Sequence, residues 1–256
     1  MIDSLKYFFR STTDSSGIEF YGFLHLTMLL VFFLGIYMIL INRKKLQQNF
    51  WLVERIKKIF SIVIFLEIIL MYSWYLFGDY MGLKDGLPIY HCRIVLILVV
   101  LYTFKPFKWL KLIIINWGLV GATIAMLIPV GDPFIFPHVT YVTYFVGHIF
   151  LGWYVMLLIV GERYRFPISD LRNIIILGII FNLFQVIVNN YLGSNYGYVS
   201  QPPVLKEYLS AFSPFIYNII MCLVYALGSI LVHMAGNSMF TNNKVKNYKE
   251  NKKYLF

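Results

Sequence analysis

Residues 59–77 read IFSIVIFLEIILMYSWYLF, and this stretch decides the fold class. It carries a single charged residue, Glu67, near its middle. An α-helix rises about 1.5 Å per residue, so about 20 apolar residues cross the hydrocarbon core of a bilayer, with a range of about 17–25. The stretch therefore predicts a membrane-spanning helix with one carboxyl group at mid-depth.

Six further apolar segments resemble this one. The third of the seven is short, and it either extends back across Pro88 or forms a partly buried helix. The sequence therefore predicts an all-α polytopic membrane helix bundle of about seven transmembrane helices. We expect an outer N-terminal segment at residues 1–19, the bundle at 20–233 and a basic cytoplasmic tail at 234–256. The predicted spans are residues 20–41, 59–77, 89–103, 110–128, 139–161, 171–192 and 212–233.

The composition agrees with a membrane location. Apolar residues make up 59% of the chain and charged residues 13%, against about 45–50% and about 25% in soluble domains. So few charges cannot cover a globular surface, which excludes a soluble domain and a disordered chain. The net charge of +10 comes from short basic runs between apolar segments. These runs indicate topology and contact with anionic lipid rather than nucleic acid.

The basic residues also predict the orientation. Cytoplasmic loops of membrane proteins carry an excess of Lys and Arg. The connections after the first, third and fifth spans, together with the C-terminal tail, hold 17 of them, and the alternate connections hold four. We therefore expect the N-terminus outside, the C-terminus inside and an odd number of spans. The expected location is the cell membrane, as a multi-pass protein.

Polar residues inside the spans are candidate functional residues, because a polar group in hydrocarbon is costly. Each also has a structural interpretation: Glu67 could pair with Arg93, and His25 could hydrogen-bond a neighbouring helix. The side chains at positions 182, 185 and 189 share one helical face and could hold helices together. The candidate substrate-binding residues are His25, Glu67, His91, Arg93, Asn182, Gln185, Asn189, Asn190, Asn195 and Tyr196.

Cys92 is the candidate nucleophile. It begins the third predicted helix beside Arg93, and both a nearby cation and a helix N-terminus favour the thiolate form of cysteine. Cys222 lies among apolar residues in the last span and is typical of an inert buried thiol. Adjacent helical residues diverge by about 100°, so His91 need not reach Cys92. A base from another helix, His148 or His25, is an equal alternative.

The pattern resembles the YwaF-like bacterial integral membrane family, which is similar to the vertebrate transmembrane protein 164 acyltransferase family. The likeness covers residues 25 to 225. Two positions depart from the family: Tyr90 stands where a His is common, and Arg93 where an acid is frequent. The residues that carry the likeness are His25, Glu67 followed by Trp74, Leu87-Pro88 leading into Cys92, Gly147-His148, the segment SNYGY at 194–198, and Pro202-Pro203.

This resemblance implies a cysteine-dependent phospholipid acyltransferase with its site in the outer half of the bundle. An acyl chain would pass from a membrane phospholipid through a thioester on Cys92 to a lysophospholipid, with His148 as the catalytic base. Asn189, Asn190 or Arg93 could hold the lipid phosphate or the oxyanion. No metal and no cofactor is expected.

Two other functions remain open from the sequence. A non-enzymatic seven-helix binding protein or transporter would use the same polar cavity for its ligand. A purely structural membrane protein would use the polar residues for helix packing alone.

Overall fold

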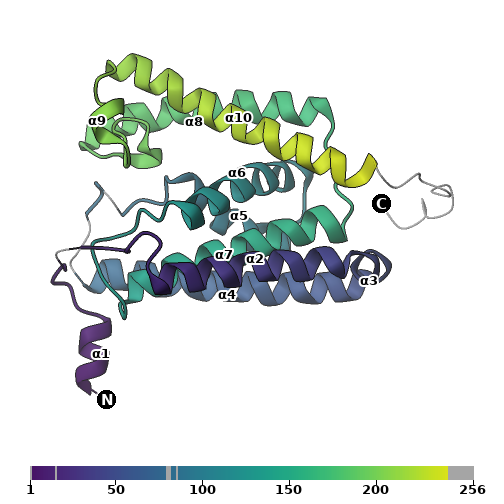
Figure 1. Cartoon of the computed structure of the whole chain (residues 1–256), viewed down its shortest axis with the longest axis horizontal. Helices are drawn as coiled ribbons and strands as arrows, with labels where there is room; N and C mark the ends of the chain where they lie inside the picture. The colour runs from purple at the N-terminus through teal and green to yellow at the C-terminus, as the bar shows by residue number, and fades with distance from the viewer. Residues whose placement is uncertain (1, 15, 79–81, 85, 242–256) are drawn as a thin grey trace.

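The computed structural model describes residues 2–14, 16–78, 82–84 and 86–241 (Figure 1). The described residues are helical and contain no strand. The helices are α1 (Ile2–Phe8), α2 (Phe23–Ile41), α3 (Arg43–Gln48), α4 (Phe50–Phe77), α5 (His91–Phe104), α6 (Lys108–Leu127), α7 (Val139–Gly161), α8 (Ile168–Leu192), the 3-10 turn Tyr196–Tyr198, α9 (Lys206–Leu209) and α10 (Pro214–Thr241).

Within the described residues, six helices are long and apolar enough to cross a bilayer: α2, α4, α6, α7, α8 and α10. The short third segment forms α5, with 14 residues and a length of about 21 Å. The all-α class and the multi-pass membrane location are therefore confirmed. The predicted number of about seven transmembrane helices is close to the structure. In the described part of the chain, six helices are long enough to span a bilayer, and α5 is a seventh apolar helix that is shorter than a full span.

Two helices are longer than predicted. Residues 50–58, expected as a basic loop, form the first turns of α4. They stay helical because Lys57 is buried and pairs with Glu54 and Glu162, each at 2.6 Å. A prediction based on apolar runs alone ends the helix where these charged residues begin, so it missed the start of α4.

Helix α10 continues to Thr241, beyond the predicted end of the last span at residue 233. The predicted tail lysines from 244 onward lie outside the described residues.

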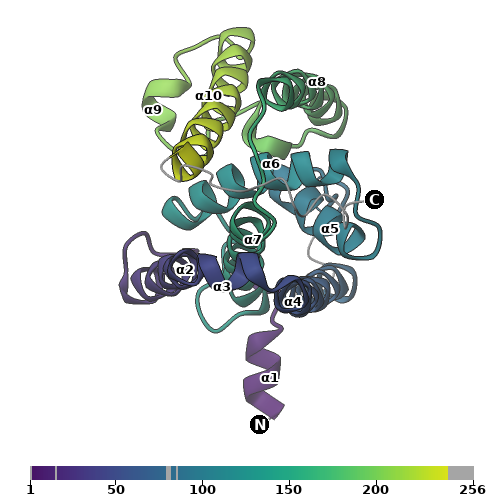
Figure 2. The same cartoon turned by 90° about the vertical axis from the view of Figure 1, so that its right-hand side faces the viewer.

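Helix α7 is the centre of the bundle. Figure 2 shows it between α2 and α4 on one side and α5 and α6 on the other, and it contacts all four. Most of its side chains are buried, which explains why the sequence of this helix is apolar all round. Gly152 permits the close approach of α2, because a Cβ there would overlap the ring of Phe32.

Helices α8 and α10 pair with each other and rest on α6, forming an outer layer (Figures 1 and 2). The polar face of α8 organises the loops at one end of the bundle. Asn189 accepts the backbone N–H of Tyr196 at 2.7 Å and donates to its carbonyl at 3.0 Å. The Tyr196 hydroxyl in turn donates to the Leu83 carbonyl at 2.7 Å and accepts from the Leu87 N–H at 2.9 Å. This end of the bundle therefore carries a fixed loop assembly above the start of α5.

Candidate functional site

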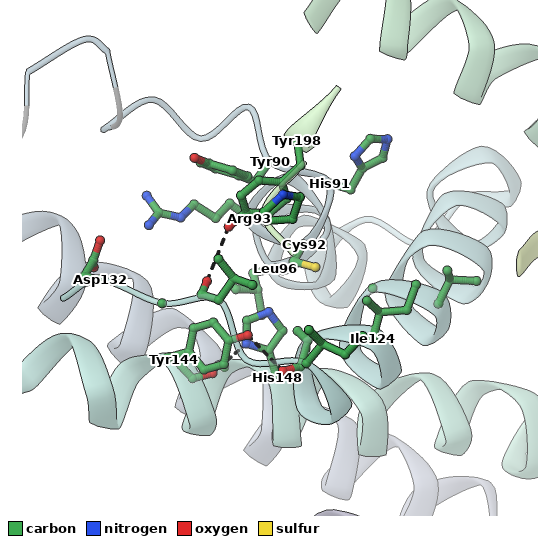
Figure 3. Close-up of a pocket in the computed structure, with 18 of the residues that line it drawn as sticks. Tyr90, His91, Cys92, Arg93, Leu96, Ile124, Asp132, Tyr144, His148 and Tyr198 are labelled. Atoms are coloured by element: carbon green, nitrogen blue, oxygen red, sulfur yellow. Dashed lines mark hydrogen bonds between the residues drawn. The ribbon is translucent and has the colours of Figure 1, made fainter. Parts of the chain in front are cut away.

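A cavity of about 590 Å³ lies between α4, α5, α6, α7 and α10 (Figure 3). Its size is typical of a small-molecule site, for which about 300–1,000 Å³ is usual. Its walls are largely apolar, from residues such as Leu96, Ile124 and Met221. Five of the predicted site residues line it: Glu67, His91, Cys92, Arg93 and His148.

Cys92 lies at the second position of α5. The helix begins at His91, and Tyr90 precedes it in extended conformation without a side-chain cap. The first N–H groups of a helix have no intrahelical acceptor and form its positive end. The sulfur packs against Gly121 of α6, where a Cβ would stand 2.6 Å from Sγ. The thiol thus has room only because α6 carries no side chain at this point.

His148 faces the same cavity from α7 (Figure 3). Its Nδ1 lies 2.6 Å from the carbonyl oxygen of Tyr144, one turn earlier. A carbonyl can only accept, so Nδ1 carries the proton, and the lone pair of the neutral ring is on Nε2. Tyr144 is itself fixed by a hydrogen bond from its hydroxyl to the Ala125 carbonyl at 2.9 Å. The geometry therefore leaves Nε2 as a hydrogen-bond acceptor.

Arg93 does not pair with Glu67. Its Nη2 donates to the Tyr75 hydroxyl at 2.6 Å, which donates to Asp132 Oδ2 at 3.0 Å. Its buried Nη1 has no hydrogen-bond partner among the described residues. No carboxylate of the described chain lies within ion-pair distance of its guanidinium. The cavity therefore contains a cation whose second nitrogen is available to a ligand.

Glu67 occupies another part of the wall. Its carboxyl group lies against Gly147 of α7, where a Cβ would stand 3.3 Å from Cδ. The residue is only 5% exposed, and its Oε2 has no hydrogen-bond partner in the described part of the chain. An acidic and a basic side chain thus line one cavity without being bonded to each other, an arrangement that suits a polar ligand.

His91 points away from Cys92, as Figure 3 shows. Its ring stacks on Tyr225 of α10 at 4.1 Å between centroids and meets the edges of Trp117 and Phe181 at 5.0 Å and 4.8 Å. This aromatic enclosure holds the first residue of α5 against α6, α8 and α10. His91 therefore fixes the helix end on which Cys92 lies.

The structure does not bring His25 to the cavity. Its Nδ1 accepts the backbone N–H of Tyr21 at 2.8 Å, and its Nε2 lies 2.7 Å from the carbonyl of Met126. Both ring nitrogens are thus engaged with backbone, joining the start of α2 to the end of α6. Of the two histidines that the sequence left open as a base, only His148 lines the cavity that also contains Cys92.

The predicted site residues of α8 and the loop after it also lie outside the cavity lining. Asn182, Gln185 and Asn189 are buried on one face of α8, as their spacing predicts. Gln185 donates to the Ile89 carbonyl at 2.7 Å, just before α5. Asn195 bonds the backbone of residues 200 and 201, whereas Asn190 is exposed. Their contacts position the loops and the start of α5.

Several lining residues were not predicted. Most of them are tyrosines. The sequence signal that could have identified one of these is its helical spacing from a predicted site residue, since Tyr75 lies eight residues after Glu67 on α4. Asp132 lies in the loop between α6 and α7, where no periodicity exists to single it out. The unpredicted polar or aromatic lining residues are Tyr75, Tyr90, Asp132, Thr140, Thr143, Tyr144, Tyr198, Tyr217 and Tyr225.

The cavity reaches the outside of the bundle between α6 and α10. Ile124 of α6, Ile128 directly after α6 and Val224 of α10 line it, yet they are 44%, 39% and 43% exposed. In a membrane this apolar rim faces lipid. This part of the cavity wall is therefore also part of the apolar outer surface of the bundle. We refer to this gap, defined by these three residues, as the α6–α10 window.

Comparison with known proteins gives one match. The model of the TMEM164 family matches residues 20–234, most of the chain. No curated protein and no solved structure matches.

Proposed function

The chain belongs to the TMEM164 family, and we propose that it is a lipid acyltransferase that carries the acyl group as a thioester on Cys92. One observation carries the proposal: Cys92 and His148 line the same apolar cavity, and the exposed apolar residues of the α6–α10 window line it too. A nucleophile, a base and a route for an acyl chain are the parts that such a reaction needs.

The first half-reaction forms the thioester. Nε2 of His148 takes the thiol proton, and Sγ of Cys92 attacks the ester carbonyl carbon of a phospholipid. The bond from that carbon to the glycerol oxygen breaks. The departing oxygen receives the proton from His148, so the products are a lysophospholipid and an acylated cysteine.

The second half-reaction reverses these roles. His148 takes the proton from the hydroxyl group of an acceptor lysophospholipid, whose oxygen attacks the thioester carbonyl carbon. The carbon–sulfur bond breaks, and Sγ recovers its proton from His148. A new ester forms, and the protein returns to its starting state.

In both steps the carbonyl oxygen gains negative charge. Donors near Cys92 that can stabilise it are the N–H groups of the first turn of α5 and Nη1 of Arg93. Asn189 is less suited to this role, since its amide group is engaged with the loop after α8. Arg93 is therefore our preferred group for the oxyanion or the lipid phosphate.

A binding protein or transporter without chemistry is the second candidate. It is favoured by the unbonded oxygen of Glu67 and nitrogen of Arg93, which suit a polar ligand as well as a transition state. Such a protein would keep its ligand affinity when Cys92 is replaced, because the thiol would not react.

The deciding experiment is acyl trapping. The purified protein is mixed with phospholipid carrying a labelled acyl chain and examined by intact-mass analysis. We expect an adduct that hydroxylamine removes, as it does a thioester, and no adduct on Cys92→Ala. Cys222→Ala is the matched control and keeps the adduct. His148→Gln slows its formation by about 10²–10⁴-fold, the usual contribution of a general base.

An adduct that survives on Cys92→Ala would reject Cys92 as the nucleophile. Labelled lipid that is retained by the protein without any covalent adduct would favour the binding protein instead.

A further inference from the structure

A second concavity lies beside α3, which joins α2 to α4 at the other end of the bundle (Figure 1). Its volume is about 420 Å³. Its apolar walls come from α2, α4 and α7, and only two polar residues, Asn42 and Lys45, are part of its lining. We call it the α3 groove; its lining residues are Gly35, Met38, Ile39, Asn42, Lys45, Leu46, Leu52, Ile56, Phe60, Trp153 and Leu157.

The groove exists because α3 separates two helices that both pack on α7. Figure 2 shows α3 crossing from α2 to α4 in front of α7, and α3 contacts all three helices. Leu46 buries the inner side of α3, and Gln47 donates to the Val160 carbonyl at 3.1 Å. The floor is fixed as well, since Trp153 donates its indole N–H to the Phe32 carbonyl at 2.9 Å.

Basic residues lie on the two helices beside the groove, and one of them, Lys45, is part of its lining. Arg43, Lys44 and Lys45 follow one another on α3, and Arg55 and Lys58 lie on the first turns of α4. All five are exposed. None forms an ion pair with another described residue. The nearby carboxylates of Glu54 and Glu162 are already bonded to Lys57 and Lys111.

We propose that the α3 groove binds an anionic phospholipid of the surrounding leaflet, with one acyl chain against Trp153 and the phosphate at Lys45. Apolar walls of this volume suit a hydrocarbon chain, and basic pockets between helices at a membrane surface attract anionic head groups. A zwitterionic lipid offers the same chain but no net charge for Lys45 and its basic neighbours on α3. This site is separate from the Cys92 cavity and does not depend on acyl transfer.

The test compares two lipids with identical acyl chains. Purified full-length protein in detergent is titrated with phosphatidylglycerol or phosphatidylcholine, and bound lipid is counted by native mass spectrometry. We expect preferential retention of phosphatidylglycerol. Replacing Lys44 and Lys45 by Glu should weaken the binding of phosphatidylglycerol by at least about fivefold for each positive charge removed. Lys206→Glu, an exposed lysine at the opposite end of the bundle, is the charge control.

A second pair of variants tests the groove itself. Met38→Trp fills space within the lining and should reduce phosphatidylglycerol retention. Leu34→Trp, at an exposed position of α2 outside the lining, should leave it unchanged. Equal retention of the two lipids by the wild type would overturn the proposal. The proposal would also be overturned if Lys206→Glu reduced phosphatidylglycerol retention as much as the double replacement of Lys44 and Lys45 does.

Discussion

At the residue scale, the proposed nucleophile is positioned by a residue that has no side chain. Gly121 leaves the space into which the sulfur of Cys92 fits, and a Cβ there would stand 2.6 Å from it. On the other side, His148 is oriented by the carbonyl of Tyr144. Gly121 of α6 thus sets the position of the thiol, and the Tyr144 carbonyl of α7 sets the tautomer of the proposed base. Neither Gly121 nor Tyr144 takes part in the proposed chemistry.

We predict that Gly121→Ala displaces the thiol and slows thioester formation by about 100-fold, because a displacement near 1 Å can cost that much. The measurement is the rate of adduct appearance by intact-mass analysis. Gly178→Ala is the matched control, since its Cβ would meet only the indole nitrogen of Trp117, at 4.0 Å. Equal rates in the two variants would show that Gly121 does not position the sulfur.

At the scale of elements, a charged cluster joins the helix ends near α3. Glu162, directly after α7, accepts from Lys57 of α4 at 2.6 Å and from Lys111 of α6 at 2.5 Å. Burial raises the pKa of Glu162, but the two lysines more than offset this, so its pKa lies below the usual value. Three helices are thus held together by one carboxylate.

We predict that Glu162→Gln destabilises the protein by about 2 kcal/mol at neutral pH. Breaking a buried pair usually costs about 3–5 kcal/mol, and Lys57 keeps Glu54 as a partner here. The contribution of a carboxylate with a lowered pKa is complete above its unfolded pKa of about 4.3 and is lost as the pH falls through the folded value. The stability difference from wild type should therefore shrink below about pH 4.

Thermal unfolding in detergent between pH 3 and 7 measures this difference. Glu54→Gln is the control. Among the described residues Glu54 pairs with Lys57 alone, so its substitution should cost less stability. A difference that stays constant with pH would argue against an ionic origin.

At the scale of the whole molecule, the two ends of the bundle differ in chemistry. Loop residues near the start of α5 help to line the Cys92 cavity, whereas the basic helix α3 lies beside the α3 groove. Figure 1 shows the start of α5 and α3 at opposite ends of the bundle. From the distribution of Lys and Arg, we expect the α3 end to face the cytoplasm. The proposed reaction then takes place in the outer half of the membrane.

We predict this orientation from single-cysteine labelling in a background with Cys92→Ala and Cys222→Ala. A cysteine at the exposed position Gln201, near the Cys92 cavity, should react in intact cells with a maleimide that cannot cross the membrane. A cysteine at Lys44 should react only after the cells are opened. Labelling of both positions from outside would mean that the number of spans between them is even.

The sequence alone determined the class of protein and the depth of its polar residues. Apolar runs such as residues 59–77 predict helices because a bilayer offers no hydrogen bonds to an irregular backbone. The 3.6-residue period predicts that Asn182, Gln185 and Asn189 share a face. Even so, the charged turns at residues 50–58 were missed, because their helix is stabilised by Glu162, more than 100 residues away.

Only the tertiary structure decided which polar residues form one site. Sequence position could not separate His25, whose nitrogens bond the backbone of α2 and α6, from His148, which faces the cavity. Nor could it show that Arg93 bonds Tyr75 rather than Glu67. Helical periodicity defines the face of each helix, but close packing between helices determines which faces meet, and this packing depends on single small residues such as Gly121 and Gly152.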